Sequence, residues 1–161
     1  MRRLLLIRHA KSSHKFDELD DHERPLNKRG ERDAITIARF IAEKNEPLDV
    51  IYSSTAIRAL DFAQAISDFS TITLVPDLSF YTFDPDELIE IIKSLPDTVY
   101  EAALVLHNPA ITQVLNQLTN GKIDNIPTAG VAAVNCPVEQ WQDILEAQAE
   151  LDYFITPKTL G

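Results

Sequence analysis

Cysteine and glycine are scarce in this sequence, and a hydrophobic run long enough to cross a membrane is absent. The single cysteine is Cys136, so no disulfide within the chain and no zinc site built from cysteines can form. No stretch approaches the roughly 18 consecutive apolar residues of a membrane span. The opening Met-Arg-Arg-Leu-Leu-Leu-Ile run is short and lacks the small-residue cleavage site of a secretion signal. We therefore expect a soluble, cytoplasmic protein with Cys136 buried as a bystander.

Basic residues are also few relative to acidic ones. The 161 residues include 15 lysines and arginines against 25 aspartates and glutamates, which gives a formal net charge of −10. Binding to nucleic acid or to anionic lipid needs a basic face that displaces counterions, so we expect no nucleic acid and no membrane among the partners. Any anion that this protein handles must be held in a local cationic pocket.

Short apolar runs alternate with segments of helical periodicity along a chain whose length is typical of one domain, residues 1–161. The runs are typical of strands buried in a parallel sheet, and the periodic segments are typical of amphipathic helices. This alternation predicts an α/β fold, a three-layer sandwich with a mostly parallel central sheet and helices on both faces. The expected strands are 4–7, 50–52, 72–75, 102–106, 131–136 and 151–155, and the expected helices lie around 28–44, 60–66, 88–95 and 111–118.

Two segments resist this pattern. Residues 138–149 are either a helix or a loop with a packed Trp141, and residues 11–23 are predicted to be a polar surface loop. His14 and His22 in that loop lack the i, i+4 spacing and the companions of a zinc site, so we expect no metal and no other cofactor. Gly30 falls inside the predicted helix 28–44, where it costs about 1 kcal/mol relative to alanine. Close approach of this turn to the functional edge of the sheet would explain it, and an early helical position is the simpler alternative.

Polar residues follow three of the predicted strands where each strand ends. In open parallel sheets, ligands bind beyond the carboxyl ends of the strands, where helix N-termini also point. We therefore expect two arginines and two histidines to meet at one edge of the sheet. They are Arg8 and His9 after the first strand, Arg58 after the second and His107 after the fourth.

The position of Arg58 is informative. If Ser54 or Thr55 caps the following helix, Arg58 lies in the first turn, where the helix dipole disfavours a cation by about a few tenths of a kcal/mol. A bound anion would reverse that sign. Without an anion, Arg58 would be a solvated side chain that reaches an acidic neighbour such as Asp61.

His107 is predicted to lie directly before a helix N-terminus, because Asn108 suits the N-cap and Pro109 the first helical position. Either histidine, taken alone, could be a hydrogen-bonded residue that closes a strand. Together with two guanidiniums they suit a phosphoryl dianion, since each guanidinium offers paired donors to neighbouring oxygens. Positive neighbours lower an imidazole pKa, so His9 could attack phosphorus as a neutral ring while His107 donates to the phosphoryl oxygens.

Several motifs follow one another in order along the chain: Arg8-His9-Ala10-Lys11-Ser12 after a Leu-Leu-Leu-Ile strand, Arg24-Pro25-Leu26 then Gly30, Ser53-Ser54 with Arg58-Ala59, and His107-Asn108-Pro109. With these motifs the chain resembles the histidine phosphatase superfamily, which includes the phosphoglycerate mutases. The short chain and its Arg-His-Ala-Lys-Ser opening resemble the SixA-type branch, which is named for phosphohistidine phosphatases.

The resemblance implies a phosphoglycerate mutase-like fold and a phosphatase that works through a transient phosphohistidine on His9. Arg24 would reach the phosphate pocket from the loop, although an arginine before proline in a polar loop is often merely solvated. Lys11, Ser12 and Ser13 match the branch without an evident role. The expected catalytic residues are His9 and His107, and the expected phosphate-binding residues are Arg8, Arg58, Arg24 and Asn108.

Mutases and phosphomonoesterases of this superfamily place an acid after the third strand to protonate the leaving alkoxide. The candidates here are Tyr81, Asp84, Asp86 and Glu87. The carboxylates have a local explanation, because Asp84 as N-cap, Pro85 at the first position and Glu87 at the third form a capping box. The imidazole of phosphohistidine leaves with much less help than an alkoxide, so a weak or absent acid favours a phosphohistidine substrate.

The sequence thus predicts a phosphatase whose partner is a protein bearing phosphohistidine, admitted by an open pocket. One alternative is a phosphomonoesterase for a small phosphorylated metabolite, with one of the candidate acids in use. The other is a non-catalytic phospho-binding module, against which the presence of a nucleophile argues.

Overall fold

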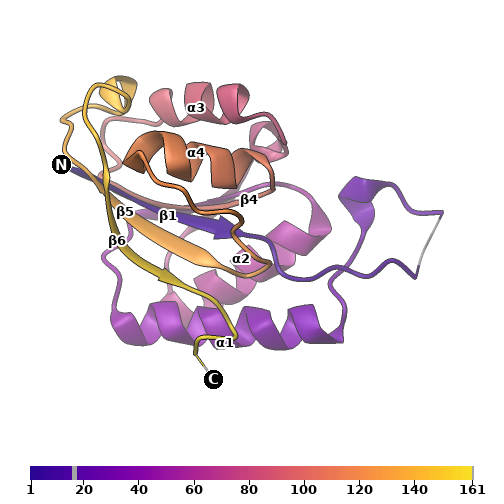
Figure 1. Cartoon of the computed structure of the whole chain (residues 1–161). Coiled ribbons are helices and arrows are strands. Elements are labelled where there is room, and N and C mark those ends of the chain that lie inside the picture. Colours follow the sequence, from indigo (N-terminus) through magenta and orange to yellow (C-terminus); the bar gives the residue numbers. More distant parts are fainter. Residues whose placement is uncertain (16–17, 161) are drawn as a thin grey trace.

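The computed structural model describes residues 1–15 and 18–160 and places six strands in one sheet (Figure 1). Their order is β3-β2-β4-β1-β5-β6. The pairs β3–β2, β2–β4 and β4–β1 are parallel, whereas β5 runs against both of its neighbours, so the sheet is mostly parallel as predicted. The strands are β1 (Arg2–Arg8), β2 (Val50–Ser53), β3 (Leu74–Pro76), β4 (Glu101–Leu106), β5 (Val131–Cys136) and β6 (Glu150–Ile155).

Helices cover both faces of the sheet, with α1 and α2 on one side and α3 and α4 on the other (Figure 1). This is the three-layer α/β sandwich that the alternating pattern predicts. The helices are α1 (Lys28–Lys44), α2 (Ile57–Ser70), α3 (Pro85–Lys93) and α4 (Ala110–Thr119), and three short 3-10 turns are η1 (Asp21–Glu23), η2 (Leu78–Phe80) and η3 (Trp141–Asp143).

Strand β1 is buried on both faces. Leu4 and Leu6 belong to the core beneath α3 and α4, while Leu5 and Ile7 belong to the core beneath α1 and α2. Because successive side chains of a strand point to opposite faces, a continuous apolar run suits only a strand covered on both sides. The end of β1 therefore lies in the middle of the carboxyl edge, between β4 and β5.

Most predicted element boundaries agree with the structure. Helix α1 coincides with the predicted 28–44, whereas β3 begins two residues later than predicted. The segment 138–149 is a loop with the 3-10 turn η3, and its buried Trp141 donates from Nε1 to the Val99 carbonyl at 2.7 Å. Cys136 is buried, as expected. Residues 16 and 17 of the predicted loop lie outside the described residues.

The predicted cap of α2 is wrong, although Arg58 does lie in the first turn. Ala56 is the N-cap residue and makes no side-chain cap bond. The Ser54 hydroxyl accepts from the Ala56 amide at 3.1 Å and also contacts His107, so it is committed to the carboxyl edge of the sheet. The Thr55 hydroxyl does not cap the helix, because it is bonded to His22, whose Nε2 lies 2.7 Å away.

The other two predicted caps are partly correct. Helix α4 begins one residue later than predicted, with Pro109 as N-cap, and the Asn108 side chain accepts from the Thr112 hydroxyl at 2.6 Å. Asp84 caps α3, but the reciprocal bond of a capping box is absent among the described residues. The Asp84 amide donates to the Thr82 hydroxyl at 3.2 Å, and that hydroxyl donates to Glu87 at 2.6 Å, so Thr82 intervenes.

Gly30 marks a close approach between the first turn of α1 and the chain that leaves β1. A Cβ atom on Gly30 would lie 2.1 Å from the carbonyl oxygen of Lys11, two residues after His9. Both explanations offered for Gly30 therefore hold, because the turn lies close to the chain that leaves β1 and Gly30 is also only the third residue of α1.

We expect Gly30→Ala to destabilise the protein by about 1–3 kcal/mol, because the clash with backbone outweighs the helical propensity gained, about 1 kcal/mol. Denaturant unfolding checks this. The exposed Arg32→Ala in the same helix is the control and should change the free energy of unfolding by less than about 0.5 kcal/mol. A Gly30→Ala variant as stable as the wild type would contradict the close approach.

Candidate active site

Strand register brings the two predicted histidines together. Arg8 pairs with Leu106 across β1 and β4, so His9 and His107 are the next residues on neighbouring strands. Their ring centroids lie 5.2 Å apart. Ser53 pairs with Val105 across β2 and β4, which brings Ser54 to the same edge.

His9 is fixed by its backbone and oriented by one ring nitrogen. Its amide donates to the Leu106 carbonyl at 3.0 Å, and its carbonyl accepts from the Ala129 amide at 2.9 Å. Its Nδ1 lies 2.7 Å from the Ala10 carbonyl. Because a carbonyl can only accept, Nδ1 carries the proton and Nε2 keeps its lone pair.

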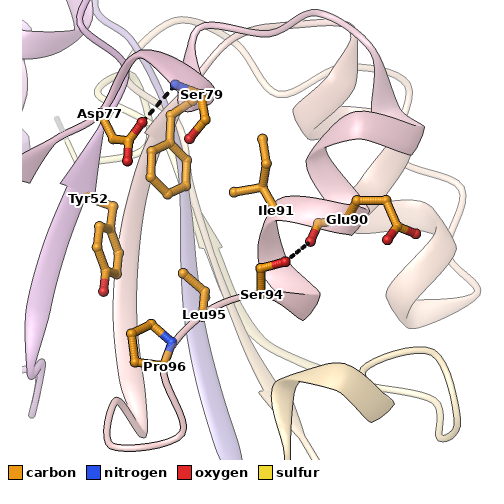
Figure 2. Close-up of a pocket in the computed structure, with 9 residues that line it drawn as sticks. Tyr52, Asp77, Ser79, Glu90, Ile91, Ser94, Leu95 and Pro96 are labelled. Carbon is orange, nitrogen blue, oxygen red and sulfur yellow. Dashed lines mark hydrogen bonds between the residues drawn. The ribbon is translucent and has the colours of Figure 1, made fainter.

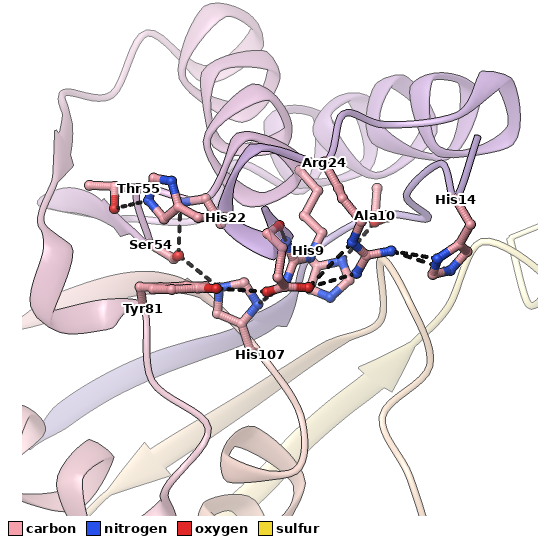
Figure 3. A network of polar contacts seen from close by, with 12 residues as sticks. His9, Ala10, His14, His22, Arg24, Ser54, Thr55, Tyr81 and His107 are labelled. Carbon is pink, nitrogen blue, oxygen red and sulfur yellow. Dashed lines mark hydrogen bonds and ion pairs between the residues drawn. The ribbon is translucent and has the colours of Figure 1, made fainter. Parts of the chain in front are cut away.

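His107 adopts the opposite tautomer. Its Nδ1 lies 3.4 Å from Nη2 of Arg58, which can only donate, so Nδ1 is unprotonated. Its Nε2 then donates to the Ser54 hydroxyl at 2.7 Å. The rings of Tyr81 and Phe83 lie against the buried imidazole, with centroids 5.3 and 5.1 Å from its own. Figure 3 shows Ser54, His107 and Tyr81 gathered beside His9.

Both imidazoles are neutral near neutral pH. The pKa of His9 is lowered to about 4, chiefly by burial and also by the positive charges of Arg58, Arg8 and Arg24, while the bond to the Ala10 carbonyl partly opposes this shift. Burial likewise lowers the pKa of His107 to about 3, helped by His9 and Arg58. The site therefore presents an unprotonated His9 Nε2 among positive charges.

Two arginines converge on these rings. Arg58 is 2% exposed, and Arg8 donates from Nη1 to the Ile126 carbonyl at 3.0 Å. The Nε atom of each is buried without a hydrogen-bond partner in the part of the chain that the structure describes. Burial and the nearby Arg58 charge lower the pKa of Arg8. An anion bound between the two guanidiniums would offset their mutual repulsion and would accept from the two unpaired Nε atoms.

Arg24 reaches this cluster from the loop, where it contacts His14 and Asp21. Its Nη1 lies 2.9 Å from Nδ1 of His14, and its Nη2 lies 3.0 Å from Oδ1 of Asp21. Its charge also contributes to the lowered pKa of His9. Arg24 is therefore more than a solvated side chain, since it bonds His14 and Asp21 and is only 19% exposed. His22 of the same loop is bonded to Thr55.

Asp21 is the site residue that the sequence analysis missed. It replaces Asp61 as the partner of Arg58, whose Nη2 donates to Oδ2 at 2.8 Å, and the Tyr81 hydroxyl donates to the same oxygen at 2.7 Å. Burial opposes ionisation, but these donors outweigh it and hold the pKa of Asp21 well below its usual range. The sequence offers one indication of this role: Asp21 stands three residues before Arg24, a spacing at which the two side chains can form an ion pair.

The Asn108 side chain forms hydrogen bonds within the segment that surrounds Arg8. Its Nδ2 donates to Oδ1 of Asn125 at 2.6 Å and to the Ile126 carbonyl at 3.1 Å. The Ile126 carbonyl also accepts from Arg8, so Asn108 braces the segment that holds this guanidinium.

Three of the four candidate acids are occupied elsewhere or contact the site indirectly, and the fourth, Asp86, is an exposed residue in the first turn of α3. Glu87 is bonded to Thr82, and Asp84 caps α3. Tyr81 does lie at the site, but its hydroxyl proton goes to Asp21.

A separate cavity of about 490 Å³ opens between β2, η2 and α3 (Figure 2). Tyr52, Phe80, Ile91 and Leu95 give it an apolar wall, and no residue of the histidine and arginine cluster lines it. This cavity is therefore distinct from the cationic site.

Within residues 1–15 and 18–160, histidine, cysteine, aspartate and glutamate side chains form no group of three or more that could hold a metal ion. No helix there is both long and apolar enough to span a membrane.

Comparisons with known proteins agree with this geometry. The sequence profile of the histidine phosphatase superfamily (branch 1) matches residues 4–83. The uncharacterized protein ML1117 of Mycobacterium leprae is 30% identical over 164 residues, which cover 94% of this chain and 100% of that protein.

Solved structures share the fold over nearly the whole chain. A candidate phosphohistidine phosphatase SixA from Agrobacterium tumefaciens superposes with a TM-score of 0.82 at 27% identity, covering 97% of this chain and 98% of that one. The protein histidine phosphatase SixA complexed with tungstate gives 0.82 at 15% identity over 99% of both chains. A mycobacterial glucosyl-3-phosphoglycerate phosphatase gives 0.72 at 15% identity over 95% of this chain and 98% of that one.

A phosphoglycerate mutase-like sheet with this profile defines a phosphatase, an enzyme of the hydrolase class. The chain belongs to the histidine phosphatase superfamily and is of the SixA type.

We expect both His9 and His107 to remain neutral down to about pH 5, because their pKa values lie near 4 and 3. Nitrogen chemical shifts of the imidazoles followed by NMR against pH check this, and they should report the proton on Nδ1 of His9 and on Nε2 of His107. Titration of His9 near pH 6.5, the ordinary value, would contradict the cationic surroundings described above.

Proposed function

We propose that this phosphatase hydrolyses phosphohistidine carried by a partner protein, through a covalent phosphohistidine on its own His9. The observation that carries the proposal is the His9 Nε2 lone pair beside the guanidiniums of buried Arg58 and half-buried Arg8, each with a buried Nε donor that lacks a partner among the described residues. A phosphoryl group would satisfy both donors and place its phosphorus before the nucleophile.

In the first step, the His9 Nε2 lone pair forms a bond to phosphorus while the bond from phosphorus to the substrate nitrogen breaks. The electron pair of that bond stays on the departing imidazole. Arg8 and Arg58 hold the phosphoryl oxygens, and Arg24 adds positive charge from the loop. The ring of His9 becomes positively charged, and the Ala10 carbonyl stabilises it by accepting from Nδ1.

In the second step, water attacks phosphorus and the bond to His9 Nε2 breaks. Its electron pair returns to Nε2, and the two protons of the water leave with the product as dihydrogen phosphate. His9 is restored as a neutral ring with its proton still on Nδ1. The pKa of about 4 makes this ring a good leaving group at neutral pH.

His107 supports both steps as a donor to a phosphoryl oxygen when its ring carries a proton on Nδ1. An approaching dianion favours protonation of Nδ1, because its negative charge stabilises the charged ring against the burial that lowers the pKa of His107. Nε2 donates to the Ser54 hydroxyl in the neutral ring and in the charged ring alike.

The leaving group supports phosphohistidine as the substrate. Asp84 and Glu87 are engaged in local structure and Tyr81 is bonded to Asp21, so none of these three is positioned to protonate an alkoxide, and Asp86 is exposed in the first turn of α3. The similarity to SixA structures favours the same substrate class, and the structural similarity to a glucosyl-3-phosphoglycerate phosphatase keeps a small metabolite as the second candidate. Parallel assays of phosphohistidine proteins and sugar phosphates with one preparation distinguish the two.

Incubation with a labelled phosphohistidine protein should yield a phosphoenzyme that is labile in acid and stable in base, the behaviour of a phosphorus–nitrogen bond. We expect His9→Ala to abolish the label and to lower turnover by roughly 10⁴-fold or more, because the nucleophile is lost. His22→Ala, which removes a histidine of the loop, is the control and should still be labelled. Unchanged turnover by His9→Ala would reject the mechanism.

Chelators should leave the rate unchanged, because each proposed step uses histidine and arginine side chains alone. Hydrolysis measured before and after treatment with EDTA and dialysis checks this. A loss of activity that an added divalent cation restores would count against the proposed cycle.

A further inference from the structure

We infer that Asp21 is a specificity-determining residue that selects phosphohistidine over phosphate monoesters. The inference rests on the proposed function and goes beyond it, because it assigns the choice of substrate to one carboxylate. Asp21 is not part of the proposed bond-making and bond-breaking cycle.

The carboxylate of Asp21 is held inside the cationic site rather than on the outer surface of the loop. Oδ2 accepts from Arg58 at 2.8 Å and from Tyr81 at 2.7 Å, and Oδ1 accepts from Arg24 at 3.0 Å. The backbone carbonyl of Asp21 also accepts from Nη1 of Arg58. These partners come from α2, from the segment after η2 and from the loop, so Asp21 is fixed from several directions.

Asp21 is nevertheless accessible from solvent. Its side chain is 46% exposed, whereas the Arg58 side chain to which it is bonded is 2% exposed. Oδ1 accepts from two nitrogens of Arg24, from Nη2 at 3.0 Å and from Nε at 3.3 Å. An incoming donor can therefore bond Oδ1 in place of the longer bond from Nε, while Nη2 of Arg24 and both donors to Oδ2 stay in place.

A phosphorylated imidazole offers the donor that this position needs. When one ring nitrogen carries the phosphoryl group, the other can carry a proton near neutral pH. With that proton in place, breaking the bond to phosphorus releases a neutral imidazole, and no acid has to deliver a proton. A hydrogen bond from this N–H to Asp21 stabilises the protonated, reactive form of the substrate.

A phosphate monoester meets the opposite effect at the same place. Its departing oxygen gains negative charge as the bond to phosphorus breaks, and a nearby ionised carboxylate raises the energy of that charge. Because its donors keep the pKa of Asp21 well below the usual range, Asp21 cannot serve as the acid instead. One residue thus favours one leaving group and disfavours the other.

Asp21 also reduces the attraction of the site for phosphate alone. Arg8, Arg24 and Arg58 surround histidines that are neutral, so Asp21 supplies the negative charge that offsets one of the three cations. Inorganic phosphate, which lacks an N–H donor, should bind more tightly once this charge is removed.

The test compares Asp21→Asn with Asp20→Asn. Both variants remove one negative charge, but exposed Asp20 makes no side-chain cap bond and is not bonded to the arginines among the described residues. The measurements are kcat/KM for a phosphohistidine peptide, kcat/KM for 4-nitrophenyl phosphate, and inhibition by inorganic phosphate. Thermal unfolding checks that each variant is folded, and Asp21→Ser replaces Asp21→Asn if the latter is not.

For Asp21→Asn we expect kcat/KM for the phosphohistidine peptide to fall about 10- to 100-fold, the effect of losing one hydrogen bond to a charged group. We expect kcat/KM for 4-nitrophenyl phosphate to stay level or rise, and phosphate to inhibit about fivefold more strongly, because the carboxylate no longer repels either anion. Asp20→Asn should leave the ratio of the two kcat/KM values unchanged.

Equal losses on both substrates, with phosphate inhibition unchanged, would show that Asp21 only holds the loop and would overturn the inference. That outcome leaves the proposed function standing as long as the wild type forms its phosphoenzyme on the phosphohistidine peptide. A wild type that forms no phosphoenzyme would reject the proposed function itself, so the two failures are distinguishable.

Discussion

The buried guanidinium of Arg58 is the group on which the arrangement of the site depends. Removing a full charge from water is costly unless partners compensate for it. Here the compensation is divided, since Asp21 takes the two Nη atoms, His107 Nδ1 accepts weakly from one of them, and Nε has no partner among the described residues. That incomplete compensation leaves positive charge directed at His9, where it helps to keep the imidazole neutral.

The same arrangement trades stability for reactivity. An imidazole buried among cations is a worse base than one in water, and a neutral histidine at pH 7 is the form that can attack phosphorus. Unpaired buried donors cost free energy of folding, which the doubly covered sheet must supply through its apolar core. Strand β1 joins the two roles, because its interior residues form the centre of that core and its end carries Arg8 and His9.

The sequence was sufficient to predict the parts of the site that follow directly from strands. Arg8, His9 and His107 each stand at the end of an apolar run, and parallel pairing then brings those ends together. Asp21 could not be found in this way, because its partner Arg58 lies 37 residues away and its loop has no periodicity. The cap predicted at Ser54 failed for a related reason, since His107 on another strand competes for that hydroxyl.

Local capping rules treat each helix terminus alone, whereas at this edge three strands deliver polar groups to one small volume. The loops that bring Asp21 and Tyr81 to the edge are independent of the sheet that positions His9. A scaffold of this kind can keep its nucleophile and guanidiniums while the loops present either an acid or a carboxylate to the leaving group. In the proposed cycle, the chemistry of phosphoryl transfer therefore depends on the strand ends and the first turn of α2, and the proposed choice of leaving group depends on the loops.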